Sequence, residues 1–153
     1  MIGQAILLIA AALSSGACKE FTMFTARDFV VLEDSEPYEF RATTPEGLVM
    51  GVRDFDNSSQ HGELKFWTTA IENKLRLDQG YALEKTSEVT TLQVQKGVQM
   101  RFGLDRDEVA HVYIVTVFAT ESRVFVLEAG GTEALVKKHQ AQIDWSVSEF
   151  LIH

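Results

Sequence analysis

Residues 110–120, AHVYIVTVFAT, carry apolar side chains at nearly every position. Because alternate residues of a β-strand point to opposite faces, both faces of this strand are apolar. One face would carry Val112, Ile114 and Phe118, and the other Tyr113, Val115 and Val117. A strand that is apolar on both faces is typical of the interior of a sheet. The stretch therefore predicts a strand in the middle of a sheet.

Shorter strand candidates lie on both sides of this stretch. Residues 124–129 are strongly apolar and follow a turn at 121–123. Residues 81–91 are polar, as expected of an edge strand, and a turn at Gln95-Lys96-Gly97 would lead into a partner strand at 98–104. Three more candidates precede them, at 28–32, 38–42 and 48–55.

Two segments have helical spacing. Leu64, Trp67, Ile71 and Leu75 predict a helix from Gly62 to Gln79, with Gly80 as its stop and Trp67 in the core. Gly130-Gly131 would close the preceding strand, and Thr132 with Glu133 would begin a last helix. The apolar stripe of that helix is Val136, His139, Ile143, Val147 and Phe150. The predicted fold is α+β: an antiparallel sheet of about six strands, one inserted helix and one C-terminal helix.

The first 17 residues contain no charged side chain. Ala5 to Leu13, AILLIAAAL, is an apolar run of the length found in signal-peptide cores. It is too short to cross a bilayer, which needs about 20 apolar residues. Small residues follow at Ser14-Ser15-Gly16-Ala17. We therefore expect residues 1–17 to be a signal peptide.

Cys18, the sole cysteine, follows this leader directly. Ser15-Gly16-Ala17-Cys18 resembles a bacterial lipobox, in which the cysteine receives a diacylglyceryl group and becomes the first mature residue. Ser15-x-Ala17 also suits the ordinary signal peptidase, which would release an unanchored protein, and a buried N-terminal helix with a buried thiol is a third interpretation. The lipobox interpretation predicts a lipidated tether at 18–27 and a single α+β domain at 28–153.

A lipid on Cys18 would place the chain in the bacterial cell envelope, anchored to a membrane and facing the periplasm. Lys19 rather than an aspartate follows the cysteine. By resemblance to enteric lipoproteins, this residue would not signal retention in the inner membrane, so the outer membrane is one expected location.

The composition bounds the classes of function. The chain has 153 residues, which suits one domain, and a formal net charge of −8. This charge argues against binding to nucleic-acid backbones, which needs a basic face. One cysteine excludes an intramolecular disulfide and a zinc site made of several cysteines.

Few residues are candidates for catalysis or metal binding. Asp105, Asp107 and His111 surround one predicted hairpin and are the candidates for a metal site or a general base, but the favoured interpretation is a solvated charged turn followed by a strand histidine. His139 falls within an apolar stripe and is expected to be a partly buried, hydrogen-bonded histidine. No serine occurs in a G-x-S-x-G motif. We expect no cofactor, and Trp145, beside the stripe of the last helix, is the predicted contact residue for a partner.

The order of these elements resembles a known family. Phe66-Trp67, Gly80-Tyr81 and Val126-Leu127-Glu128-Ala129-Gly130-Gly131 look like the corresponding segments of small bacterial lipoproteins with the PsbP-like fold. That fold is shared by extrinsic photosystem II subunits and a Ran-binding relative, and the resemblance covers residues 28–152. It implies an accessory or interaction protein without catalysis, and it transfers no set of functional residues.

The functional expectation combines the leader and the resemblance. We expect an exported, lipid-anchored, non-catalytic domain that binds a protein partner in an envelope complex. The alternative is a periplasmic protein that binds a small ligand or a metal, or a hydrolase, using the hairpin at 105–111.

Overall fold

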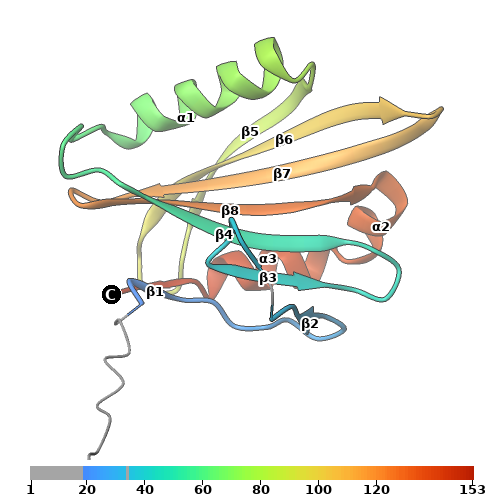
Figure 1. Cartoon of the computed structure of the whole chain (residues 1–153), viewed down its shortest axis with the longest axis horizontal. Helices are drawn as coiled ribbons and strands as arrows, with labels where there is room; N and C mark the ends of the chain where they lie inside the picture. Colours follow the sequence, from blue (N-terminus) through green and yellow to red (C-terminus); the bar gives the residue numbers. More distant parts are fainter. Residues whose placement is uncertain (1–18, 34) are drawn as a thin grey trace, which may run out of the picture.

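The computed structural model describes residues 19–33 and 35–153. Cys18 and the predicted signal peptide lie outside the described residues. The centre of the structure is a seven-stranded sheet in the order β2-β3-β4-β8-β7-β6-β5, in which all neighbours are antiparallel (Figure 1). In chain order its strands are β2 (Val30–Val31), β3 (Phe40–Thr43), β4 (Val49–Asp56), β5 (Ala82–Thr90), β6 (Lys96–Arg106), β7 (Val109–Ala119) and β8 (Arg123–Thr132).

Each face of the sheet is covered by a different set of elements. Helix α1 and the π-helical turn η1 that continues it lie on one face (Figure 1). Two further helices and a small two-stranded sheet, in which the two ends of the described chain pair, lie on the other. These elements are α1 (Leu64–Asn73), η1 (Lys74–Asp78), α2 (Glu133–Lys138), α3 (Gln140–Ser148), β1 (Phe21–Thr22) and β9 (Leu151–Ile152).

The stretch 110–120 forms β7, inside the sheet between β6 and β8, as predicted. On one face Val115 and Val117 pack with Leu75 beneath α1 and η1. On the other face Ile114 and Phe118 belong to the clusters covered by α2, α3 and the N-terminal segment. The α+β class and the antiparallel sheet are therefore confirmed, and polar β5 lies at one edge of the sheet.

Two predicted turns are strands instead. Gly130-Gly131 continue β8 to Thr132, because Tyr113 and Leu48 pack against them: a Cβ would lie 3.3 Å from Tyr113 Cδ2 at Gly130 and 3.0 Å from Leu48 Cδ1 at Gly131. Gly97 lies inside β6, where a Cβ would come within 2.5 Å of the Phe118 ring. The chain turns earlier, at residues 91–95.

The predicted last helix is two helices with a break at His139. The helix begins as predicted, since the Thr132 hydroxyl accepts a hydrogen bond of 3.3 Å from the Leu135 amide. His139 itself is buried, and its ring meets that of Phe29 edge to face with the centroids 5.9 Å apart. Neither ring nitrogen has a hydrogen-bond partner among the described residues, so the expected hydrogen-bonded histidine is wrong.

The folded domain begins before residue 28. Phe21 of β1 pairs with Ile152 of β9, and its ring is buried among Phe125 and Phe150. Ala26 is buried as well. Most of the segment predicted to be a tether is therefore part of the domain, and the boundary moves from residue 28 to residue 21.

Asn57, which is buried, joins the start of the α1 segment to the turn between β7 and β8. Its amide nitrogen donates to the carbonyls of Gly62 (3.0 Å) and Thr120 (2.7 Å). Its Oδ1 accepts from the Gly62 amide and from Trp67 Nε1, both at 2.9 Å. Trp67 thus packs against the core as predicted, while its indole nitrogen binds Asn57.

Replacing Asn57 tests this junction. Asn57→Ala leaves the indole and two carbonyls without partners in a buried place, so the free energy of unfolding should fall by about 2–4 kcal/mol. Urea denaturation measures the loss. Asn73→Ala, at an exposed position of α1, is the matched control and should change stability by less than about 0.5 kcal/mol. Equal midpoints for the two variants would show that Asn57 does not secure the junction.

Candidate interaction site on the open half of the sheet

Helix α1 covers only half of its face of the sheet. It packs against β6 and β7, whereas β3, β4 and β8 continue beyond it. Polar and aromatic side chains gather on this open half. We call the group formed by five of them the Tyr38 cluster; its members are Tyr38, Arg41, Arg53, Tyr113 and Glu128.

An ion pair lies at the centre of the Tyr38 cluster. Glu128 projects from β8 and its side chain is only 5% exposed. Arg53 of the neighbouring strand β4 donates from Nη2 to Glu128 Oε1. The other carboxylate oxygen has no hydrogen-bond partner among the described residues. A buried carboxylate is tolerated in a sheet only when a cation compensates it, so Arg53 is what permits Glu128 here.

The Tyr38 ring packs over this ion pair. Its ring lies against Gly51, where a Cβ would come within 2.6 Å of Tyr38 Cδ1. The guanidinium carbons of Arg41 and Arg53 lie 5.6 and 5.5 Å from the ring centroid, within the range of cation–π attraction. Gly51 is therefore required so that the tyrosine can reach the two arginines.

The tyrosines of the cluster are held in their neutral form. Burial raises the pKa of Tyr113 far above its ordinary value, and the Glu128 carboxylate raises it further. The pKa of Tyr38 is raised as well, first by burial and then by Glu128. A phenol with a raised pKa donates hydrogen bonds but is neither a base nor a nucleophile at neutral pH. The cluster can therefore offer hydrogen-bond donors and guanidinium groups, which suit binding better than catalysis.

Exposed Phe55 extends the site along β4. Its ring centroid lies 5.8 Å from the guanidinium carbon of Arg53, and the residue is 42% exposed. Tyrosine, arginine and phenylalanine are the residue types enriched in protein–protein interfaces. Together with the Tyr38 cluster, Phe55 makes this half of the face the strongest candidate site on the described surface.

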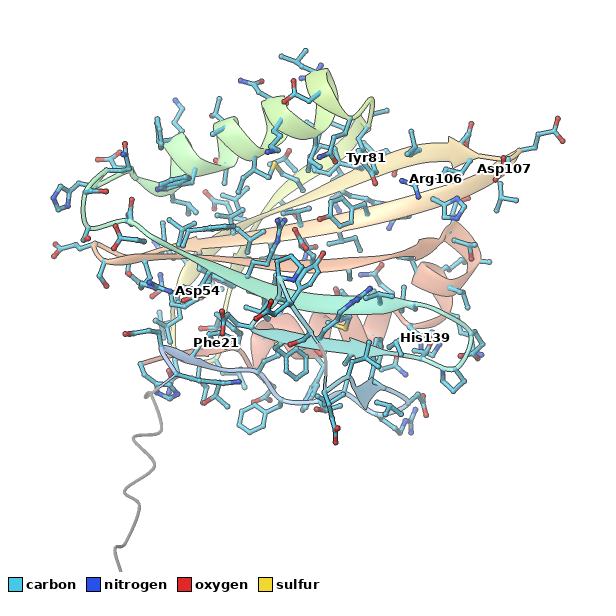
Figure 2. The ribbon with its side chains drawn as sticks, viewed as in Figure 1. Phe21, Asp54, Tyr81, Arg106, Asp107 and His139 are labelled. Atoms are coloured by element: carbon cyan, nitrogen blue, oxygen red, sulfur yellow. The ribbon has the colours of Figure 1, made fainter. Side chains whose placement is uncertain are left out.

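The predicted hairpin residues lie elsewhere. Figure 2 shows Asp107 at the tip of the β6–β7 hairpin, which projects from the end of the sheet. His111 Nδ1 lies 2.9 Å from the carbonyl oxygen of Val109, two residues away. Within residues 19–33 and 35–153, no group of three or more His, Cys, Asp or Glu side chains is arranged to hold a metal. Asp105 belongs to the ladder opposite Ala110, so the three residues form a solvated hairpin end.

Trp145 is on α3, on the opposite side of the sheet from the Tyr38 cluster. Its side chain is 42% exposed. It lines a shallow hollow with Ala26, Arg27, Lys138 and Ala141, so one wall of that hollow comes from the N-terminal segment. Its role as a contact residue stays a prediction.

Sequence reasoning did not find the Tyr38 cluster. Two signals were available: Glu128 interrupts an apolar strand, VFVLEAGG, and Gly51 lies inside β4. A charge within a buried strand implies a compensating cation nearby. Which arginine supplies it depends on the strand order, and the sequence does not contain that information locally.

Comparison with known proteins identifies the fold. The sequence matches no protein-family model and no curated protein sequence. Among solved structures, cyanobacterial PsbP (CyanoP) from Synechocystis has a TM-score of 0.64 at 11% identity, covering 88% of this chain and 87% of CyanoP. LpqN of Mycobacterium tuberculosis, whose structure is described as that of a protein involved in cell envelope biogenesis, has a TM-score of 0.65 at 11% identity over 86% of this chain and 82% of LpqN.

A third similar structure comes from Bacteroides thetaiotaomicron, with a TM-score of 0.57 at 13% identity; the match covers 88% of this chain and 45% of that protein. These likenesses show that the chain has the PsbP-like fold, as the resemblance implied. In the part of the chain that the structure describes, no helix is both long enough and apolar enough to span a bilayer.

A double-mutant cycle tests the packing of the site. Gly51→Ala places a methyl group 2.6 Å from Tyr38 Cδ1, which is a steric clash. The free energy of unfolding should therefore fall by about 1–3 kcal/mol. In a Tyr38→Ala background the clash is gone, and the same substitution should cost well under half as much. Urea denaturation of the four proteins gives the coupling. An equal cost in both backgrounds would mean that the ring does not lie on Gly51.

Proposed function

We propose that this chain is an exported lipoprotein, held to a membrane by acyl chains on Cys18, whose domain binds a protein partner in the cell envelope without catalysing a reaction. The observation that carries the proposal is the Tyr38 cluster, a preformed set of donors and cations on an uncovered half of the sheet.

The leader and the fold support the envelope assignment. An uncharged apolar run followed by small residues and the sole cysteine suits export and lipidation. LpqN, a protein involved in cell envelope biogenesis, has the same fold. Two or three acyl chains would hold the protein stably, whereas one chain alone is marginal.

The charge of the site supports a partner with an acidic segment. The chain carries a net charge of −8, yet the Tyr38 cluster combines two arginines with one carboxylate. Because Arg53 already pairs with Glu128, Arg41 can pair with a carboxylate of the partner. Complementary charges of this kind favour association and fix its register.

Crosslinking in intact membranes tests the partner site. We expect a chemical crosslinker to join the chain to a distinct envelope protein, and Arg41→Glu to remove most of this product because it opposes an acidic partner. Lys65→Glu, the same charge reversal at an exposed position of α1, is the matched control and should leave the product unchanged. A product that survives Arg41→Glu at full yield would contradict this interface.

Lipidation has its own test. Globomycin, an inhibitor of the lipoprotein signal peptidase, should cause a form with an uncleaved leader to accumulate, and Cys18→Ser should abolish that response. If globomycin changes neither the electrophoretic mobility nor the membrane fractionation of the chain, the chain is not a lipoprotein.

A further inference from the structure

The connection between β5 and β6 presents two apolar side chains to solvent. Leu92 is 70% exposed and Val94 is 73% exposed, and Lys96 follows them. The loop that carries these side chains has a defined backbone conformation. Buried Thr91 fixes it, because the Thr91 amide donates to the Gln95 carbonyl at 3.0 Å and the Val94 amide donates to the Thr91 carbonyl at 2.8 Å.

The backbone of Val94 conflicts with its side chain. Its φ is +66°, in the left-handed region that favours glycine and asparagine. A β-branched residue in that region is unfavourable. Folding alone would prefer glycine or asparagine at this position, so an apolar side chain here points to a use outside the fold.

The loop lies beside the start of the folded chain. The Leu92 amide donates to the Ser148 carbonyl at 2.8 Å, at the end of α3. Three residues later Leu151 pairs with Thr22 of β1. Figure 1 shows the connection between β5 and β6 reaching the corner where β1 and the C-terminus lie, while the β6–β7 hairpin points to the opposite end.

A lipid on Cys18 would bring this corner to the bilayer. Only Lys19 and Glu20 separate Cys18 from Phe21, which is fixed in the core. Three residues span at most about 11 Å, so the anchor could not hold the domain far from the membrane surface. An exposed aliphatic pair next to a lysine suits the interface of a bilayer that contains anionic lipid.

We propose that the loop at residues 91–95 inserts Leu92 and Val94 into the bilayer that holds Cys18, and that this contact fixes the orientation of the domain on the membrane. The inference rests on the proposed lipid anchor. It adds a second membrane contact and directs the β6–β7 hairpin away from the membrane.

A fluorescent reporter tests the inserted loop. The lipidated full chain is reconstituted in vesicles of phosphatidylethanolamine and phosphatidylglycerol, with an NBD label at Val94→Cys or at Leu77→Cys. The introduced thiol is labelled alone, because the sulfur of a lipidated Cys18 is a thioether. Leu77, on η1, is 79% exposed and serves as the matched control. Brominated acyl chains should quench the label at 94 about threefold more strongly than the label at 77.

The outcomes separate the inference from the anchor. Equal quenching at both positions, in protein that floats with the vesicles, would overturn the inserted loop and leave the anchor intact. Protein that does not float with the vesicles would overturn both. A label at 94 that is shielded in native membranes but not quenched in these vesicles would show that a protein covers the loop, and this result also overturns insertion.

An additional substitution distinguishes insertion from folding. With the label at Leu92→Cys, Val94→Asn should reduce quenching while leaving the melting temperature unchanged or higher, because asparagine suits a positive φ. A lower melting temperature with unchanged quenching would show that Val94 serves the fold, and would contradict the proposal.

Discussion

The constraint on which the structure depends is that its central strands are apolar on both faces. β7 and β8 must exclude water on both sides, so the sheet needs two covering layers. On one side α2, α3 and the chain ends complete the cover. On the other, α1 packs mainly against β6 and β7 and leaves part of the face uncovered. The remainder of that face is covered by Tyr38 and the pair of Arg53 with Glu128, which makes this half more polar than the rest.

The need to cover both apolar faces of the sheet also explains why the N-terminal segment is part of the folded domain. Phe21 supplies an aromatic ring to the cluster around Phe118, Phe125 and Phe150, and β1 is held there by pairing with β9. The fold therefore begins almost at Cys18. One packing requirement thus brings together the predicted lipid anchor, the C-terminus and the apolar loop between β5 and β6.

Much of the architecture could be predicted because its signals are local. The two-faced apolar pattern of β7, the stripe of α1 and the Thr132 cap each depend on residues close together in the chain. The failures share one cause. Gly97, Gly130 and Gly131 resemble turn residues, yet the structure uses them to admit Phe118, Tyr113 and Leu48 from other elements. The break at His139 and the partners of Glu128 likewise depend on contacts between distant segments.

We propose that the mature protein begins at a lipid-modified cysteine directly beside the folded domain. Intact-mass measurement of the protein purified from native membranes, with fragmentation of its N-terminal peptide, tests this most directly. We expect the first residue to be Cys18, with its mass increased by a diacylglyceryl group. An N-terminus at Met1, or at any residue without a lipid, would contradict it.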